Sequence, residues 1–195
     1  MCKGMARIGI CKIMKWFITS VYPTKKTTID KFPFFVGRNE NLSRNGMVFQ
    51  DATISREQFV LESRLRGFFY KNLSKGSPAT LDGVVVVGEC KLDAGVPHVI
   101  HMGHAIVVLG SNSNSVSQMV EQIASEHYIV SHNNEDFGLL KEDDLLNYCE
   151  NGIFKPTTKV CCVANPDKVM EMSELIDFGY EGVEPVESAP VGEKK

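Results

Sequence analysis

Short runs of β-branched and aromatic residues, separated by turn residues, fill residues 15–110. No stretch of helical periodicity interrupts them. Many short strands between Gly, Pro, Asn and Asp are typical of an all-β sandwich or barrel. We therefore predict strands in the runs Lys15–Val21, Phe32–Gly37, Met47–Gln50, Gln58–Ser63, Phe68–Asn72, Val84–Val87 and Ala105–Leu109. The Phe34–Gly37 and Val84–Val87 runs should supply the core, with Trp16 in the core or packed at its edge.

The pattern changes after residue 110. Residues 111–117 (SNSNSVS) are polar and of low complexity, which predicts a linker over 111–126, with Val116–Ala124 compatible with a short helix. Residues 127–180 predict a small α+β domain. Its elements are strands at His127–Ser131 and Lys159–Ala164, a helix at Lys141–Asn151 with Gly152 as its C′ residue, and a short helix at Met172–Asp177.

The two ends differ from both units. Residues 1–14 read as an upstream leader or an uncertain start, because Met14 stands just before the first clear strand. Lys12 and Lys15 interrupt the apolar run that a signal peptide needs, so no signal peptide is expected. Whether residues 1–13 belong to the mature chain stays open. Residues 181–195, rich in Glu, Pro and Val, predict a disordered tail.

Composition narrows the function classes. The chain of 195 residues is 43% hydrophobic and 23% charged, which is typical of a soluble globular protein. A formal net charge of −3 disfavours nucleic acid as the main partner, although a local basic patch can hide in such a total. No apolar window is long enough for membrane insertion. The six cysteines form no CxxC pair, which favours reduced thiols and a cytoplasmic location.

Motifs for catalysis and metal binding are missing. The chain has no GxxxxGK[ST], GxSxG, HExxH or GxGxxG motif, so we expect no enzyme and no cofactor. His98, His101 and His104 recur every third residue, a spacing that alternates faces on a strand. Ordinary strand and turn histidines are therefore favoured over a metal site.

Three short segments stand out together. They are Gly37-Arg38 after an apolar strand, the loop Asp51–Phe59 (DATISREQF), and the stretch from Asn72-Leu73-Ser74 to Thr80-Leu81-Asp82-Gly83. Each is weak alone, since an Arg at a strand end is usually a solvated charge. Their order, spacing and strand context resemble the forkhead-associated (FHA) domain. The resemblance covers roughly residues 15–110.

This resemblance implies a sandwich of two twisted antiparallel sheets whose loops bind phosphothreonine peptides. Arg38 would clamp the phosphate, Ser55 would donate a hydroxyl hydrogen bond, and Arg56 would add a charge-assisted contact. Ser77 would stand where the family has the Asn that grips the peptide backbone. A dianionic phosphate with three acceptor oxygens suits such donors. Structural roles in the loops would fall to Gly37, Gln58, Asp82 and Gly83.

The sequence departs from the family pattern at several positions. Gln58 replaces the usual His, and a Gln amide both donates and accepts hydrogen bonds. Ser77 replaces the Asn, Gly76 replaces a hydroxyl residue, and Asp82 replaces the Asn of an Asn-Gly hairpin. The phosphate clamp is thus retained and the peptide clamp weakened.

The second unit, from His127 to Phe178, faintly resembles the bacterial GYF-like repeat domain. The correspondence rests on His127-Tyr128, Phe137-Gly138-Leu139, Leu145-Leu146, Gly152 and Thr158-Lys159-Val160. The usual tryptophans are absent, so binding of proline-rich peptides is not carried over, and a protein-interaction or spacer role is the better inference.

Together these features predict a non-catalytic signalling adaptor. Its partner would be a protein phosphorylated on threonine by a Ser/Thr kinase. The alternative is a degenerate FHA scaffold that mediates phosphate-independent protein interaction or oligomerisation, and a nucleic-acid-associated module ranks third. Lys25-Lys26, Arg64 and Arg66 read as solvated charges, or as steering groups if they border the Arg38 end. The oligomeric state stays open.

Overall fold

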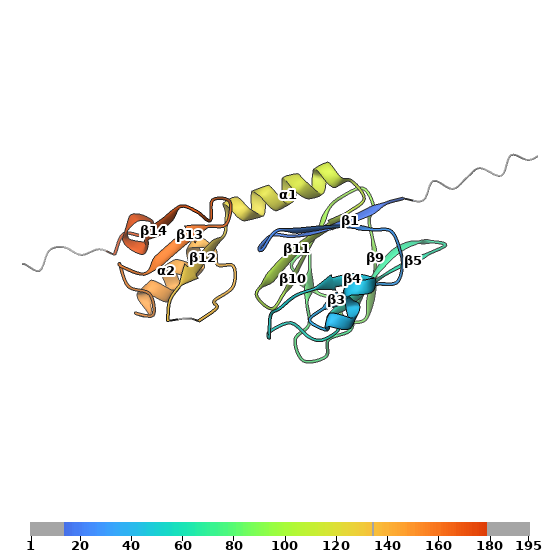
Figure 1. Ribbon diagram of the computed structural model, residues 1–195, viewed down its shortest axis with the longest axis horizontal. Coiled ribbons are helices and arrows are strands. Elements are labelled where there is room, and N and C mark those ends of the chain that lie inside the picture. Colours follow the sequence, from blue (N-terminus) through green and yellow to red (C-terminus); the bar gives the residue numbers. More distant parts are fainter. Residues whose placement is uncertain (1–13, 134, 179–195) are drawn as a thin grey trace, which may run out of the picture.

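The computed structural model describes residues 14–133 and 135–178, so the predicted leader (but for Met14) and tail lie outside it. Two β-sheets face each other in the N-terminal unit (Figure 1). One sheet has the strand order β2 (Lys25–Ile29), β1 (Trp16–Ser20), β11 (Ala105–Gly110), β10 (His98–Met102), β7 (Thr80–Leu81) and β8 (Val84–Val85). The other has the order β4 (Gly46–Val48), β3 (Phe34–Gly37), β5 (Phe59–Arg64), β6 (Gly67–Asn72) and β9 (Glu89–Leu92).

The predicted sandwich is confirmed. Strand pairs within it are antiparallel except β3 and β4, which run parallel because the 3₁₀ helix η1 (Glu40–Arg44) carries the chain back between them. Side chains from both sheets form one core. Trp16, Phe59, Tyr70, Val36 and Ile100 are each exposed by 1% or less.

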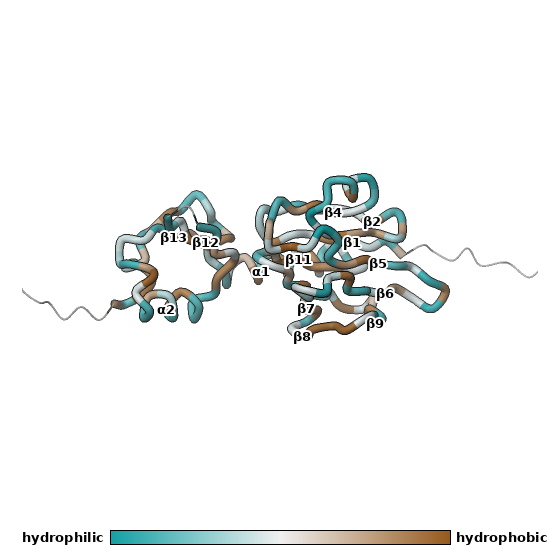
Figure 2. The backbone as a smooth tube through the Cα atoms, turned by 90° about the horizontal axis from the view of Figure 1, so that it is seen from below, coloured by the Kyte–Doolittle hydropathy of each residue, from teal (hydrophilic) through white to brown (hydrophobic). Residues whose placement is uncertain are grey.

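The Val84–Val87 run is not core, and that prediction is wrong. Val84, Val85 and Val87 are 66%, 50% and 94% exposed, and only Val86 packs against the core. The reason is position, since β8 is a two-residue edge strand with no neighbour on its outer side. Figure 2 shows this hydrophobic segment on the outer border of the sandwich, between β8 and β9.

Helix α1 (Ser113–Ser125) occupies most of the predicted linker. Asn112 caps it, with its Oδ1 accepting a hydrogen bond of 2.9 Å from the amide of Asn114. Its buried side chains Val116, Val120, Ile123 and Ala124 pack against β1 and β11. The segment between the units is therefore a packed helix that covers the outer face of a sheet (Figure 1). No helix in the described ranges is long and apolar enough to cross a membrane.

The C-terminal unit contains a three-stranded antiparallel sheet and one α-helix. Its elements are β12 (Tyr128–Ser131), α2 (Glu142–Glu150), β13 (Lys159–Cys162), β14 (Val169–Glu171) and the 3₁₀ helix η2 (Met172–Glu174). The helix predicted at Lys141–Asn151 and both predicted strands are confirmed, whereas the segment Met172–Asp177 contains only the short 3₁₀ helix η2. Gly152 ends α2 at a φ of 70°, a value that favours glycine. Leu145 packs with Phe154 and Val160 into a separate small core.

Candidate functional site

The loop that follows β3 is joined to the loop that precedes β5. The amide of Arg38 donates to the carbonyl of Ser55 at 3.0 Å, and the amide of Asn39 donates to that of Arg56 at 3.1 Å. A Cβ atom at Gly37 would lie 2.3 Å from the carbonyl oxygen of Arg56. Only glycine therefore permits this approach, which sets Arg38 beside Ser55 and Arg56.

Gln58 connects the second loop to the third. Its side chain is fully buried. Its Oε1 accepts from the amide of Ser55 at 2.9 Å, and its Nε2 donates to the carbonyl of Ser77 at 2.7 Å. The Gln58 carbonyl also accepts from the amides of Leu73 and Ser74. A side chain that both donates and accepts is needed here, and Gln meets that need.

Ser74 lies at the centre of the hydroxyl groups. Its Oγ is 2.7 Å from Ser55 Oγ and accepts from the amide of Ser77 at 3.2 Å. The sequence predicted Ser55 and Ser77 but gave Ser74 no role, although it stands in the third segment. Among the described residues, hydrogen bonds join Ser55 to Ser77 through Ser74 and Gln58. We call the group Arg38, Ser55, Arg56, Ser74 and Ser77 the loop rim.

The two arginines of the loop rim are exposed, and neither forms an ion pair with a described residue. Arg64 offers the contrast, because Glu62 and Glu89 hold its guanidinium, with Glu89 Oε2 at 2.6 Å. Two unneutralised guanidinium groups on adjacent loops give this end of the sandwich a local positive charge. Such donors suit a ligand with several anionic oxygens.

The predicted Asp82-Gly83 hairpin forms apart from the loop rim. Both residues have positive φ, 51° and 81°, and they turn the chain from β7 to β8. Asp82 Oδ2 lies 2.7 Å from His98 Nδ1, and Asp82 Oδ1 accepts from the amide of Val99 at 2.8 Å. Among the described residues, no hydrogen bond links Asp82 or Gly83 to the loop rim. Their contacts anchor the hairpin to β10.

Asp51 fixes the start of the second loop. Its Oδ1 accepts from the amide and the hydroxyl of Thr53 at 2.8 and 2.6 Å, and its Oδ2 accepts from the amide of His104 at 3.1 Å. Burial by itself raises the pKa of Asp51, but the hydrogen bonds from Thr53 and His104 outweigh it, and the net shift is downward. The loop is thus held by a carboxylate that stays ionised.

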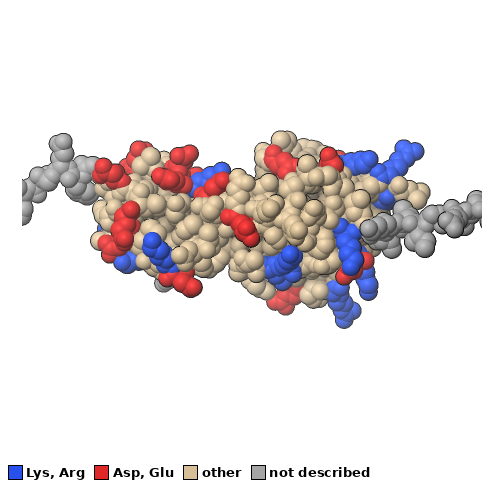
Figure 3. Space-filling view, turned by 90° about the horizontal axis from the view of Figure 1, so that it is seen from above, with Lys and Arg blue, Asp and Glu red and all other residues tan. Residues whose placement is uncertain are grey.

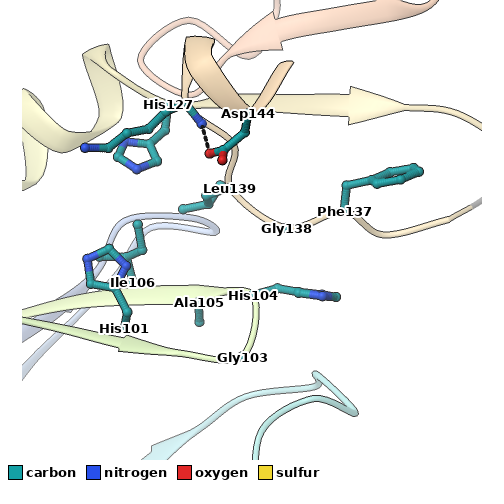
Figure 4. A pocket seen from close by; sticks show the side chains of 11 residues that line it. His101, Gly103, His104, Ala105, Ile106, His127, Phe137, Gly138, Leu139 and Asp144 are labelled. Carbon is teal, nitrogen blue, oxygen red and sulfur yellow. Dashed lines mark hydrogen bonds between the residues drawn. The ribbon is translucent and has the colours of Figure 1, made fainter. Parts of the chain in front are cut away.

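A hollow of about 190 Å³ is lined by residues of the β10–β11 hairpin and of the C-terminal unit (Figure 4). His101 and His127 lie on one side of it, while His104 points away toward Phe137. Lys141 also lines the hollow. Burial, with His127 and Lys141 nearby, lowers the pKa of His101. The described residues contain no cluster of three or more side chains suited to a metal ion.

The fold and the loop rim define a β-sandwich that presents two unpaired arginines and three serines at one end. No protein-family model matches the chain, and no curated protein is significantly similar to it. Solved FHA domains are similar in structure. The FHA domain of the CT664 protein from Chlamydia trachomatis is 13% identical, with a TM-score of 0.44, over 51% of this chain and 99% of that chain.

Two further solved structures show the same extent of likeness. The FhaA FHA domain is 16% identical, with a TM-score of 0.41, over 48% of this chain and 98% of that chain. The MEK1 FHA domain, solved in complex with a phosphothreonine peptide of HOP1, is 19% identical, with a TM-score of 0.41, over 50% of this chain and 97% of that chain. Each likeness concerns the fold of about half of this chain.

Proposed function

We propose that this protein is a non-catalytic adaptor whose loop rim binds phosphothreonine on a partner protein. The observation that carries the proposal is that Arg38, Ser55, Arg56 and Ser77 lie on three hydrogen-bonded loops, and that no carboxylate among the described residues pairs with either guanidinium group. A phosphothreonine brings nearly two negative charges and three strong acceptor oxygens. Its phosphate would complete the pairing that the arginines lack.

Each residue of the loop rim has a distinct part. Arg38 would clamp the phosphate, and Arg56 would add a second charge-assisted hydrogen bond. Ser55 Oγ already contacts Ser74 Oγ, and when Ser74 donates its hydrogen to Ser55, the Ser55 hydroxyl keeps its own hydrogen to donate to the phosphate. The exposed Ser77 would meet the peptide backbone. A Ser/Thr kinase acting on the partner is implied.

The test is a titration of the full chain with matched peptides that do or do not carry phosphothreonine. We expect binding that disappears without the phosphate. Arg38→Ala should lower the affinity at least tenfold, because the loss of a charge-assisted hydrogen bond costs about 1.5–3 kcal/mol. The melting temperature should hardly change, since the Arg38 side chain is exposed and makes no ion pair with a described residue.

Arg66→Ala is the matched control. Arg66 is equally exposed, but it lies on the turn between β5 and β6 rather than on the loop rim. Its substitution should leave phosphopeptide affinity unchanged. If Arg38→Ala instead unfolds the protein, or if it weakens binding no more than Arg66→Ala does, Arg38 is not the phosphate clamp.

The exposed valines of the β8 edge favour one alternative, a scaffold that binds proteins without phosphate. Val84, Val85 and Val87 form an apolar strip beside an unpaired strand edge, which another strand can join. Such binding would survive both removal of the phosphate and Arg38→Ala. In either case the C-terminal unit would supply a second contact with the partner protein, or it would position the contact that the sandwich makes.

A further inference from the structure

Three turns of the chain stack on one another, from the loop that carries Ser55 and Arg56 to the C-terminal unit. The first is the Asp51–Thr53 turn, the second is the β10–β11 turn at Gly103-His104, and the third is the Asp136–Gly138 turn. The amide of His104 donates to Asp51 Oδ2 and to Thr53 Oγ1, each at 3.1 Å. On its other side, His104 Nδ1 lies 3.4 Å from Asp136 Oδ2.

Glycines make both contacts of the stack possible. A Cβ at Gly103, where φ is 52°, would fall 2.1 Å from Thr53 Oγ1. A Cβ at Gly138, where φ is 74°, would fall 2.9 Å from His104 Cβ (Figure 4). Both φ values also favour glycine. The C-terminal unit therefore rests directly on the turn that holds the second loop of the site.

Beside this stack lies a cleft of about 430 Å³, within the range of small-ligand pockets, about 300–1,000 Å³. The sandwich contributes Tyr22, Pro23 and Phe49 to its walls, and the C-terminal unit contributes Ile129 and Leu139. Tyr22 is 41% exposed, and Ile129 and Leu139 are only partly buried. Apolar surface from both units is thus left open to a ligand.

The cleft adjoins the loop rim through the chain itself. Asp51 lines the cleft and stands four positions before Ser55, so the two Cα atoms are at most about 14 Å apart. Phe49, another lining residue, donates its amide hydrogen to the carbonyl of Gly37, the neighbour of Arg38. An extended peptide covers such a distance in about four residues.

We infer that this cleft is the second half of the peptide site and receives an apolar side chain lying about two to five residues from the phosphothreonine. The inference rests on the proposed function and deepens it. Charged groups of both signs line the cleft, Lys25 on one hand and Asp51 and Asp136 on the other, so an acidic segment is not favoured. An aliphatic or aromatic side chain matches the walls.

The test uses the full chain and phosphothreonine peptides in which one leucine is moved from position −5 to position +5 among serines and glycines. Leucine should strengthen binding about tenfold at one or two neighbouring positions on one side only, because burial of its side chain removes apolar area from water. Tyr22→Ala and Ile129→Ala, one on each wall, should each reduce that gain several-fold. The affinity of each variant for the peptide without leucine is the baseline from which its gain is calculated.

Val169→Ala is the matched control in the C-terminal unit, because Val169 is 60% exposed and lies outside the cleft. It should leave the leucine gain intact. Suppose that leucine strengthens binding at no position, while the binding still depends on phosphate and is removed by Arg38→Ala. That result overturns the inference about the cleft and leaves the proposed function standing. The inference about the cleft is also overturned if leucine still strengthens binding in both Tyr22→Ala and Ile129→Ala. Failure of every phosphopeptide to bind overturns both proposals.

Discussion

Gln58 is a structural residue of the candidate site, because its side chain joins two of the loops. Its fully buried amide satisfies the amide of Ser55 and the carbonyl of Ser77, two groups on different loops. Truncation of the side chain would leave both groups without this partner in a partly buried region. A buried polar group without its partner costs about 1–3 kcal/mol.

Gln58→Ala should therefore lower the free energy of unfolding by about 2–4 kcal/mol, the sum of a cavity and lost hydrogen bonds. Chemical denaturation followed by fluorescence measures this change. The matched control is Gln50→Ala at an exposed position, which should stay within about 0.5 kcal/mol of the parent protein. Equal effects of the two substitutions would show that Gln58 does not hold the loops.

At the residue scale, the sequence singled out the three loops but not the hydrogen bonds that join them. The order of Gly37-Arg38, Asp51–Phe59 and the Ser77 stretch singled out all three loops. It did not single out Ser74, because the hydroxyl contact with Ser55 joins positions 19 residues apart and depends on how two loops fold together. Hydrogen bonds between loops leave no periodic trace in a sequence.

At the scale of elements, the valine-rich run at β8 is mostly exposed, whereas the one in β11 is buried. In β11, Val107 and Leu109 face the core between the sheets, and Ile106 and Val108 face α1, so both sides of the strand are buried. In the Val84–Val87 run only Val86 packs against the core. Hydrophobicity alone does not distinguish a central strand from an edge strand.

The pair Val107→Ala and Val87→Ala tests this difference. Val107 is fully buried, so its truncation should cost about 2 kcal/mol or more of unfolding free energy. Val87 is 94% exposed, and its truncation should cost less than about 0.5 kcal/mol. Equilibrium denaturation of both variants measures the costs. A large loss at Val87 would mean that this strip is covered in solution, as the scaffold alternative requires.

Strands with polar residues escaped prediction for a related reason. β2, β7, β9 and β10 were not predicted from the pattern. β2 and β9 border their sheets and expose Lys, Thr and Glu side chains, while β10 alternates buried and exposed positions with two histidines. Central strands buried on both faces give continuous apolar runs, whereas strands with one wet face give weaker alternation. The apolar strands of the sandwich were predictable, whereas its strands with polar side chains were not.

For the whole molecule, the net charge of −3 conceals a strong asymmetry. Residues 1–110 contain 15 Lys and Arg against 8 Asp and Glu, a net charge of +7, and residues 111–195 contain 6 against 16, a net charge of −10. Figure 3 shows Lys and Arg gathered mainly over the sandwich and Asp and Glu over the C-terminal unit. A dianionic peptide is thus attracted to one unit and repelled by the other.

This field should act on the rate of association more than on the rate of dissociation, because it steers the approach of the peptide. An increase of ionic strength from about 0.01 M to about 0.15 M shortens the Debye length from about 30 Å to about 8 Å. Stopped-flow measurements should then show phosphopeptide association slowed about tenfold, with a smaller change in dissociation. Lys75→Glu, beside Ser74, should slow association at low salt, whereas Lys168→Glu, an equal charge change at an exposed position of the C-terminal unit, should not. Equal slowing by both variants would mean that net charge alone sets the rate, and that the positive end of the sandwich does not guide the phosphate to Arg38.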